Sequence, residues 1–282
     1  MLNVLKSDLY KLFRSRALYI CLLAAVLFIL IVPFSLEALQ NMMKTMSPED
    51  MAIIEQTSES GVQGMNVGLS STTLLSEEPL SGQWYLGNVY SGNTLLLVLV
   101  IFISIFVSAE FSHGTIKNIA SKGVSRSKIY LSKLLTVMIV TAIFSLVLAA
   151  VGTLAASCMW GFGPVSGEVI WQCIRLVLMQ TLLHIALVSF FMMICFIMKN
   201  SGAAISINIC SMMFIPTIFA LIDKLLKKDA WISNIWPATY INSLVTLTPE
   251  MSLLIKALAI ALIYIVVSSA LGMFVFHKKD IA

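Results

Sequence analysis

The residues of this 282-residue chain that could carry out chemistry are three histidines, five cysteines and one polar segment, 109–133, between two apolar runs. The sequence contains neither the H-E-x-x-H motif of a metalloprotease nor the G-x-x-x-x-G-K-[ST] loop of an ATPase. Its cysteines lie in apolar runs without a C-x-x-C spacing or a neighbouring histidine pair. Metal, redox and intramembrane enzyme chemistry are therefore disfavoured. We assign no disulfide, although Cys158 and Cys173 could pair if their loop faces an oxidising compartment.

The polar segment 109–133 has the residue types of a short surface helix. Gly114 and Thr115 predict a turn and a helix N-cap, and Gly123 predicts the end of that helix. A new helix is expected from Ser125. Because the segment is far more polar than the runs on either side, we expect it to lie outside the membrane.

Four polar side chains interrupt two later apolar runs and are candidates for a substrate path. Arg175, Gln180 and His184 lie in one run, and Asn208 lies in the next. Gln180 and His184 are one helical turn apart. Ionisable groups at such depth usually face a bundle interior or an aqueous path. The alternative is that these side chains form hydrogen bonds that hold neighbouring helices together.

The elements that must position these residues follow from composition. The chain is 59% hydrophobic and 11% charged, whereas soluble domains carry about 25% charged residues. Its six apolar runs each have about 20 residues or more, enough for a helix to cross a hydrocarbon core of about 30 Å. We therefore expect an all-α integral membrane protein with one transmembrane domain, 1–282. The predicted spans are about 17–35, 90–109, 130–156, 170–198, 203–222 and 252–276.

The charge distribution predicts the orientation of these spans. Twelve of the eighteen lysine and arginine residues lie in segments that share one side of the membrane, which favours both termini in the cytoplasm. In residues 1–16, Leu5, Leu9 and Leu12 recur at helical spacing, with Asp8 and the lysines on other faces. This pattern predicts an uncleaved amphipathic helix along the inner leaflet. The alternative is a basic tail that only directs topology.

Two long segments are expected on the outer side. Segment 36–89 carries one lysine against seven acidic residues, and Ser47-Pro48-Glu49-Asp50 predicts the start of a helix near 48–58. Its acidic face could attract cationic peptides, or it is a solvated loop whose acids follow the topology. Segment 224–250 contains Trp231 and Trp236, which predict a stretch at the outer interface.

The polar segment resembles the ABC-2 family of transporter permeases, especially those that export bacitracin-like and lantibiotic peptides. In that family the second span ends in an acidic residue followed by Gly-Thr-(Ile/Leu)-(Lys/Arg) and then Ser-Arg. Residues 1–16 look like the family's elbow helix, and Pro237-Ala-Thr-Tyr240 resembles its outer re-entrant region, expected here at 224–250. The long first outer loop departs from the plainer members and leaves the substrate class open. The residues that fit the polar motif are Glu110, Gly114, Thr115, Ile116, Lys117, Ser125, Arg126 and Lys133.

The resemblance implies a six-span fold like that of type V exporters, with a cytoplasmic coupling helix in loop 110–129 that docks on an ATP-binding subunit. The chain would be a transport subunit rather than an enzyme, with ATP and Mg bound by two copies of that partner. A second permease copy, identical or related, would complete the complex in a bacterial plasma membrane, and no nucleic acid is expected as a partner. Glu110 would pair with a basic residue of the coupling region or contact the ATPase.

The implied cargo is an amphipathic or antimicrobial peptide that is moved out of the membrane or the cell. Two other interpretations stay open. One is a membrane immunity or sensor protein without transport, which has no need of the Gly-Thr-Ile-Lys segment. The other is an ABC exporter of a different substrate, such as lipid or sodium.

Substitution in the coupling segment should separate ATP hydrolysis from export. We expect Gly114→Pro or Glu110→Ala to abolish export while the chain still inserts into the membrane and its partner still hydrolyses ATP. Both rates can be measured on the same membrane preparation. Unchanged export in both variants would refute the role assigned to this loop.

Overall fold

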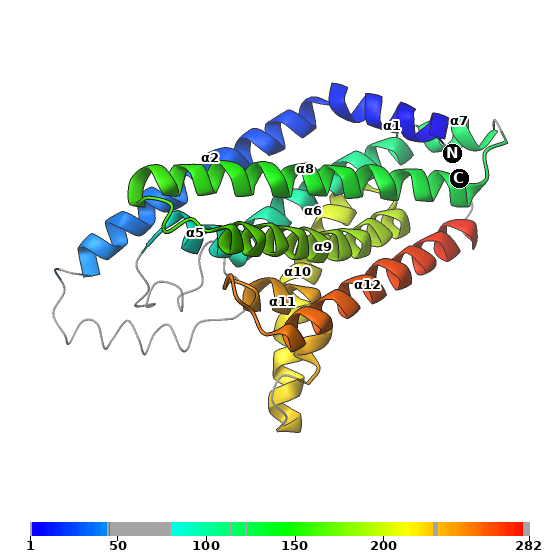
Figure 1. The fold of residues 1–282 in the computed structure, drawn as a ribbon. Helices are drawn as coiled ribbons and strands as arrows, with labels where there is room; N and C mark the ends of the chain where they lie inside the picture. Colours follow the sequence, from blue (N-terminus) through cyan, green and yellow to red (C-terminus); the bar gives the residue numbers. More distant parts are fainter. Residues whose placement is uncertain are drawn as a thin grey trace.

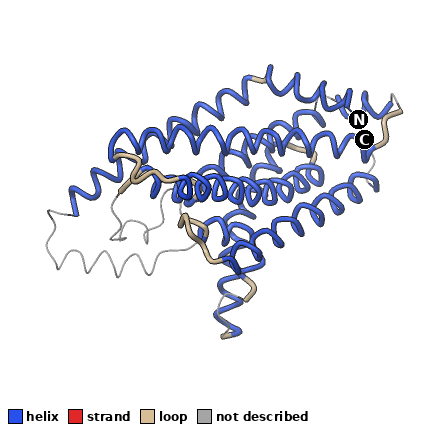
Figure 2. The backbone as a smooth tube through the Cα atoms, in the orientation of Figure 1, coloured by secondary structure: helices blue, strands red, loops and turns tan. Residues whose placement is uncertain are grey.

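The computed structural model describes residues 2–43, 45, 80–112, 114–121, 123–227 and 231–278, and this part of the chain is helical with connecting loops (Figures 1 and 2). Six of its helices are long and apolar enough to cross a membrane. The predicted all-α, multi-pass architecture is confirmed at this level. The predicted helix near 48–58 lies outside the described residues. The six helices are α2 (Arg16–Met43), α6 (Thr94–Ser112), α8 (Arg126–Trp160), α9 (Gly167–Met198), α10 (Ser201–Leu226) and α12 (Met251–Lys278).

Short helices lie at both ends of this bundle. Helices α1 (Leu2–Arg14) and α7 (Thr115–Ser121) lie at the end that also holds both chain termini (Figure 1). Helices α5 (Gly82–Asn88) and α11 (Pro237–Ser243) lie at the opposite end, with the 3-10 turns η1 (Ser91–Asn93) and η2 (Ser233–Ile235). Both termini on one side agree with the predicted even number of spans.

The loop expected at 110–129 is shorter than predicted. Helix α6 continues to Ser112, and α8 already begins at Arg126. The hydropathy pattern marks where apolar residues end, but a helix can continue past that point because its backbone hydrogen bonds are internal. For the same reason α2 extends to Met43, well beyond the predicted span end at 35.

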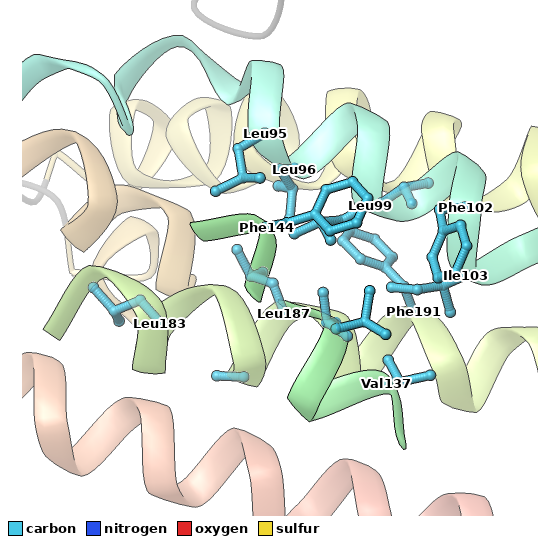
Figure 3. Packing of buried hydrophobic residues seen from close by; sticks show 14 of the residues in the cluster. Leu95, Leu96, Leu99, Phe102, Ile103, Val137, Phe144, Leu183, Leu187 and Phe191 are labelled. Carbon is cyan, nitrogen blue, oxygen red and sulfur yellow. The ribbon is translucent and has the colours of Figure 1, made fainter. Parts of the chain in front are cut away.

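The core lies between α6, α8 and α9 (Figure 3). Helix α9 is at its centre, in contact with α6, α8, α10 and α12. Leu99, Phe102, Val137, Leu187 and Phe191 are fully buried in this core. Close packing of this kind is the main attraction between helices in lipid, where no hydrophobic effect acts between them. By contrast, only 11% of the most apolar stretch of α10 is buried, which leaves that helix as the most exposed of the six.

The end of the bundle that holds α5 is joined to α2 near a proline. Pro33 has no N–H, so the carbonyl of Ile29 loses its helical donor. The Tyr85 hydroxyl replaces that donor, with its oxygen 3.1 Å from the Ile29 carbonyl oxygen. Burial raises the pKa of Tyr85 above its usual range, which keeps the hydroxyl protonated and able to donate.

The loop between α8 and α9 pairs with the start of α5. The Gly82 amide donates to the Gly161 carbonyl at 2.9 Å, and the Gln83 side chain donates to the Pro164 carbonyl at 2.7 Å. Cys158 before this loop and Cys173 after it are both free thiols, so the possible disulfide is absent from the structure.

Gly87 should be intolerant of a side chain. A Cβ atom at this position of α5 would collide with the backbone carbonyl of Val245, which cannot rotate away. We expect Gly87→Ala to lower the free energy of unfolding by about 1–3 kcal/mol, the usual cost of overpacking. The measurement is denaturant unfolding of the purified protein in detergent.

Gly202→Ala is the matched control, because a Cβ there would lie 3.5 Å from Asn200 Oδ1, an ordinary contact. Alanine in that exposed helical position should be neutral or stabilising. Equal stability of the two variants would contradict the close approach at Gly87.

Candidate functional site

The predicted coupling segment forms α7, a two-turn helix between two left-handed glycines. Gly114 has φ +64° and Gly123 has φ +80°, a conformation that residues with a Cβ rarely adopt. The Gly114 carbonyl accepts the first helical bond, from the Asn118 amide at 3.1 Å. Ile116 is 1% exposed and packs inward, whereas Asn118 and Ser121 are exposed. The helix therefore has one buried anchor and a polar outer face.

The other predicted coupling residues flank this helix. Thr115 is its first residue and is partly exposed, and Ser125 is exposed just before α8. The Arg126 guanidinium donates to the His277 carbonyl at 3.0 Å, which ties the start of α8 to the C-terminal end of α12. Lys117 lies within α7, but its side chain is outside the described residues.

Beneath α7 lies a buried group of charges, Asp8, Glu110 and Lys133, called here the ion cluster. Lys133 is fully buried on α8, with its Nζ 2.5 Å from Asp8 Oδ1 on α1 and paired with Glu110 Oε2 on α6. Asp8 also accepts a hydrogen bond from the Ser132 hydroxyl at 2.9 Å. The ammonium group lies 5.7 Å from the centre of the Phe106 ring, within range of a cation–π attraction.

The ion cluster is electrically balanced once a second lysine is counted. Lys11 Nζ lies 3.7 Å from Glu110 Oε1, and its side chain is 38% exposed. Two carboxylates thus face two ammonium groups. Removing one partner from a buried ion pair leaves an uncompensated charge in the interior, which lowers the free energy of unfolding by about 3–5 kcal/mol. The cluster therefore acts as an obligatory joint between α1, α6 and α8.

The ion cluster bears on two sequence-based expectations, for Asp8 and for Glu110. Asp8 was expected on a polar face of the amphipathic helix, but it is 0% exposed, because the buried Lys133 ammonium requires a counter-charge. Glu110 pairs with a basic residue near the coupling segment, the first of the two roles predicted for it. At 7% exposure it has little surface for contact with another protein.

Two of the predicted substrate-path residues bond to the backbone of residues 241–247. Gln180 is 0% exposed, and its amide donates to the carbonyls of Ile241 at 3.0 Å and Leu244 at 2.8 Å. Arg175 donates to the Leu247 carbonyl at 3.2 Å. These bonds join α9 to the end of α11 and to the loop that follows it.

The other two predicted path residues lie at different interfaces. The His184 Nδ1 atom is 2.8 Å from the Gln180 carbonyl, and its ring centre is 5.7 Å from that of Tyr90. Asn208 instead donates to the Ser104 hydroxyl at 2.9 Å, between α10 and α6. The Asn208 bond is of the kind expected from the alternative interpretation, hydrogen bonding between helices, whereas the His184 contact with the Gln180 carbonyl lies within α9. A role in a substrate path stays a prediction.

Residues 81–282 match the profile of a family described as Protein of unknown function (DUF2705). The chain belongs to the DUF2705 family. The matched region runs from the residue before α5 through α12, so it includes Glu110 and Lys133 of the ion cluster but not Asp8. A search of curated proteins found no match.

Sequence reasoning missed two structural residues of this DUF2705 protein. Asp223, near the end of α10, accepts bonds from the amides of Ile232 at 2.7 Å and Ser233 at 2.8 Å. Trp236 was expected at the outer interface, but it is 2% exposed and packs edge-on against aromatic rings, whereas Trp231 is 61% exposed. Spacing places both tryptophans in one segment and carries no signal of which one turns inward.

Lys133 should be essential for stability. We expect Lys133→Met to lower the free energy of unfolding by about 3–5 kcal/mol, because Asp8 and Glu110 would remain buried without the cation between them. Lys128→Met is the control, since Lys128 is exposed on the first turn of the same helix. Denaturant unfolding in detergent measures both.

A triple variant separates charge from packing. Asp8→Asn and Glu110→Gln, combined with Lys133→Met, remove all three charges together, and much of the lost stability should return. If Lys133→Met were as stable as Lys128→Met, the ion cluster would not be the joint described here.

Proposed function

We propose that this DUF2705 protein is the membrane-spanning permease subunit of an ATP-driven ABC exporter. The observation that carries the proposal is α7, a short helix with a polar face, placed between the second and third spans. Its position and its residues, Gly114 to Lys117 followed by Ser125 and Arg126, match the pattern of the ABC-2 coupling helix. The exposed side chains of Asn118 and Ser121 supply a docking face.

The connections of α7 to the bundle suit a force-transmitting role. Ile116 anchors it in the core, and Glu110, two residues before the end of α6, pairs with Lys133 on α8. Through Asp8 the same lysine also holds α1, which in this proposal corresponds to the elbow helix of the ABC-2 family. A push on α7 by an ATP-binding subunit would therefore tilt α6 and α8 together and carry α1 with them.

The energy source and the stoichiometry follow from this assignment. The sequence has no phosphate-binding loop, so ATP and Mg would be bound by a separate subunit. One permease chain offers one docking helix, and a pair of ATPases therefore requires two permease copies, identical or related. The proposed cargo is an amphipathic or antimicrobial peptide, and this choice is supported by the resemblance to peptide-export permeases. Under the positive-inside rule α7 and both termini face the cytoplasm.

Blocking the face of α7 should release the ATPase. The chain is purified in mild detergent from membranes of its native cells, and ATP hydrolysis in the purified fraction is measured. We expect Asn118→Trp to reduce the co-purified activity at least about tenfold, because a bulky side chain on the docking face costs more than 1.4 kcal/mol of binding.

Asn242→Trp is the matched control, since Asn242 is also exposed on a short helix but at the opposite end of the bundle. It should leave the activity unchanged. Absence of ATP hydrolysis with the unmodified chain, or its equal loss in both variants, would contradict the proposal and favour the immunity or sensor alternative.

A further inference from the structure

A recess of about 270 Å³ opens beside the ion cluster, between the α1–α2 junction and α6. Its lining runs along α6 from Phe102 to Glu110, a stretch of nine residues that rises about 12 Å along the helix. Thr115 of α7 borders it, as do Lys11 of α1 and Ala17 of α2. The recess thus begins at the polar end of the bundle and extends toward the apolar part of a span.

The walls of the recess change from polar to apolar along this length. Phe102, Ile105 and Phe106 line the part nearer the middle of α6, whereas Lys11 and Glu110 line the part near the end of α6. Such a gradient suits a molecule with a charged head and a hydrocarbon tail. The volume is near the lower end of the range for ligand sites, about 300–1,000 Å³. It can hold a headgroup and the first part of one chain, with the remainder in the bilayer.

The two charged groups that line the recess, Lys11 and Glu110, are incompletely paired. Neither Glu110 carboxylate oxygen accepts a hydrogen bond. Oε2 has the ion pair with Lys133, but Oε1 has only the Lys11 ammonium at 3.7 Å, beyond hydrogen-bond distance. Buried oxygens without a donor are uncommon. Oε1 is buried as the protein stands, so it becomes an acceptor for an N–H group when the Lys11 ammonium, whose side chain is 38% exposed, turns to donate to an anion instead.

We propose that this recess binds a phospholipid with a primary amine, phosphatidylethanolamine, from the leaflet at the end of the bundle that holds both termini. The lipid ammonium donates to Glu110 Oε1, and its phosphate accepts from Lys11. One acyl chain lies along Phe102, Ile105 and Phe106. The proposal does not depend on the proposed export function.

Headgroup chemistry decides between the common phospholipids. Phosphatidylcholine carries the same charges, but its quaternary nitrogen has no N–H to donate to Glu110. Phosphatidylglycerol has no cation and would bring its phosphate beside the Glu110 carboxylate. A charge-assisted hydrogen bond contributes about 1.5–3 kcal/mol, so each of these lipids should bind about tenfold or more weakly than phosphatidylethanolamine.

Native mass spectrometry of the purified chain tests this proposal, with each dioleoyl lipid added in turn to delipidated protein. We expect phosphatidylethanolamine to bind at least about tenfold more tightly than the other two lipids. Lys11→Met should weaken its binding about tenfold by removing the phosphate donor. Ala17→Leu should weaken it by filling the recess.

Two matched variants control for general effects. Lys6→Met removes an exposed lysine of the same helix, and Ala24→Leu enlarges an exposed alanine of the same span. Both should bind phosphatidylethanolamine as the unmodified chain does. Thermal unfolding of all four variants in the same detergent identifies any that fail to fold, and the two control variants should unfold as the unmodified chain does.

Three results would overturn the proposal. One is equal binding of phosphatidylglycerol, which would show that Glu110 contributes no acceptor. Another is equal weakening by Lys6→Met and Lys11→Met, which would indicate general surface attraction. The third is full displacement by soluble phosphoethanolamine at equal concentration, which would show that the apolar wall contributes nothing.

Discussion

A lysine ammonium buried among membrane helices must have counter-charges, and this constraint at Lys133 organises one end of the protein. Its two carboxylate partners come from different helices, Asp8 from α1 and Glu110 from α6. An isolated charge in such surroundings costs several kcal/mol, so neither helix can leave α8 without a large loss of stability. The N-terminal helix is thereby part of the bundle rather than a loosely attached amphipathic tail.

The two ends of the bundle are held by different interactions. At the end with both termini, ion pairs join α1, α6 and α8, and the Arg126 guanidinium bonds a carbonyl of α12. At the opposite end, side chains donate to backbone carbonyls, as Tyr85 does to Ile29, Gln180 to Ile241 and Arg175 to Leu247. In the proposed exporter, force enters at the charged end. The ion cluster there holds together α6 and α8, the two spans on either side of α7, and joins α1 to them.

The candidate site was predictable where the signal is local. The turn at Gly114 and the break at Gly123 could be read from residue type, because both positions adopt a left-handed backbone that glycine accepts without strain. The roles of Gln180 and Asn208 could not be read this way. Each was recognisable as a polar group in an apolar run, but whether it faces water or a carbonyl depends on segments distant in the sequence. Gln180 contacts the end of α11, and Asn208 contacts Ser104 of α6.

The sequence by itself determined that the chain forms six helices long and apolar enough to cross a membrane, because a span must satisfy its own backbone hydrogen bonds and reach across about 30 Å of hydrocarbon. Both requirements are met within about twenty consecutive residues, so they leave a local pattern. Only the tertiary structure decided that Asp8 is buried against Lys133, that Trp236 turns inward, and that a recess opens beside Glu110. These features depend on contacts between helices that are distant in the sequence. The residues next to either partner do not indicate which contact is favourable.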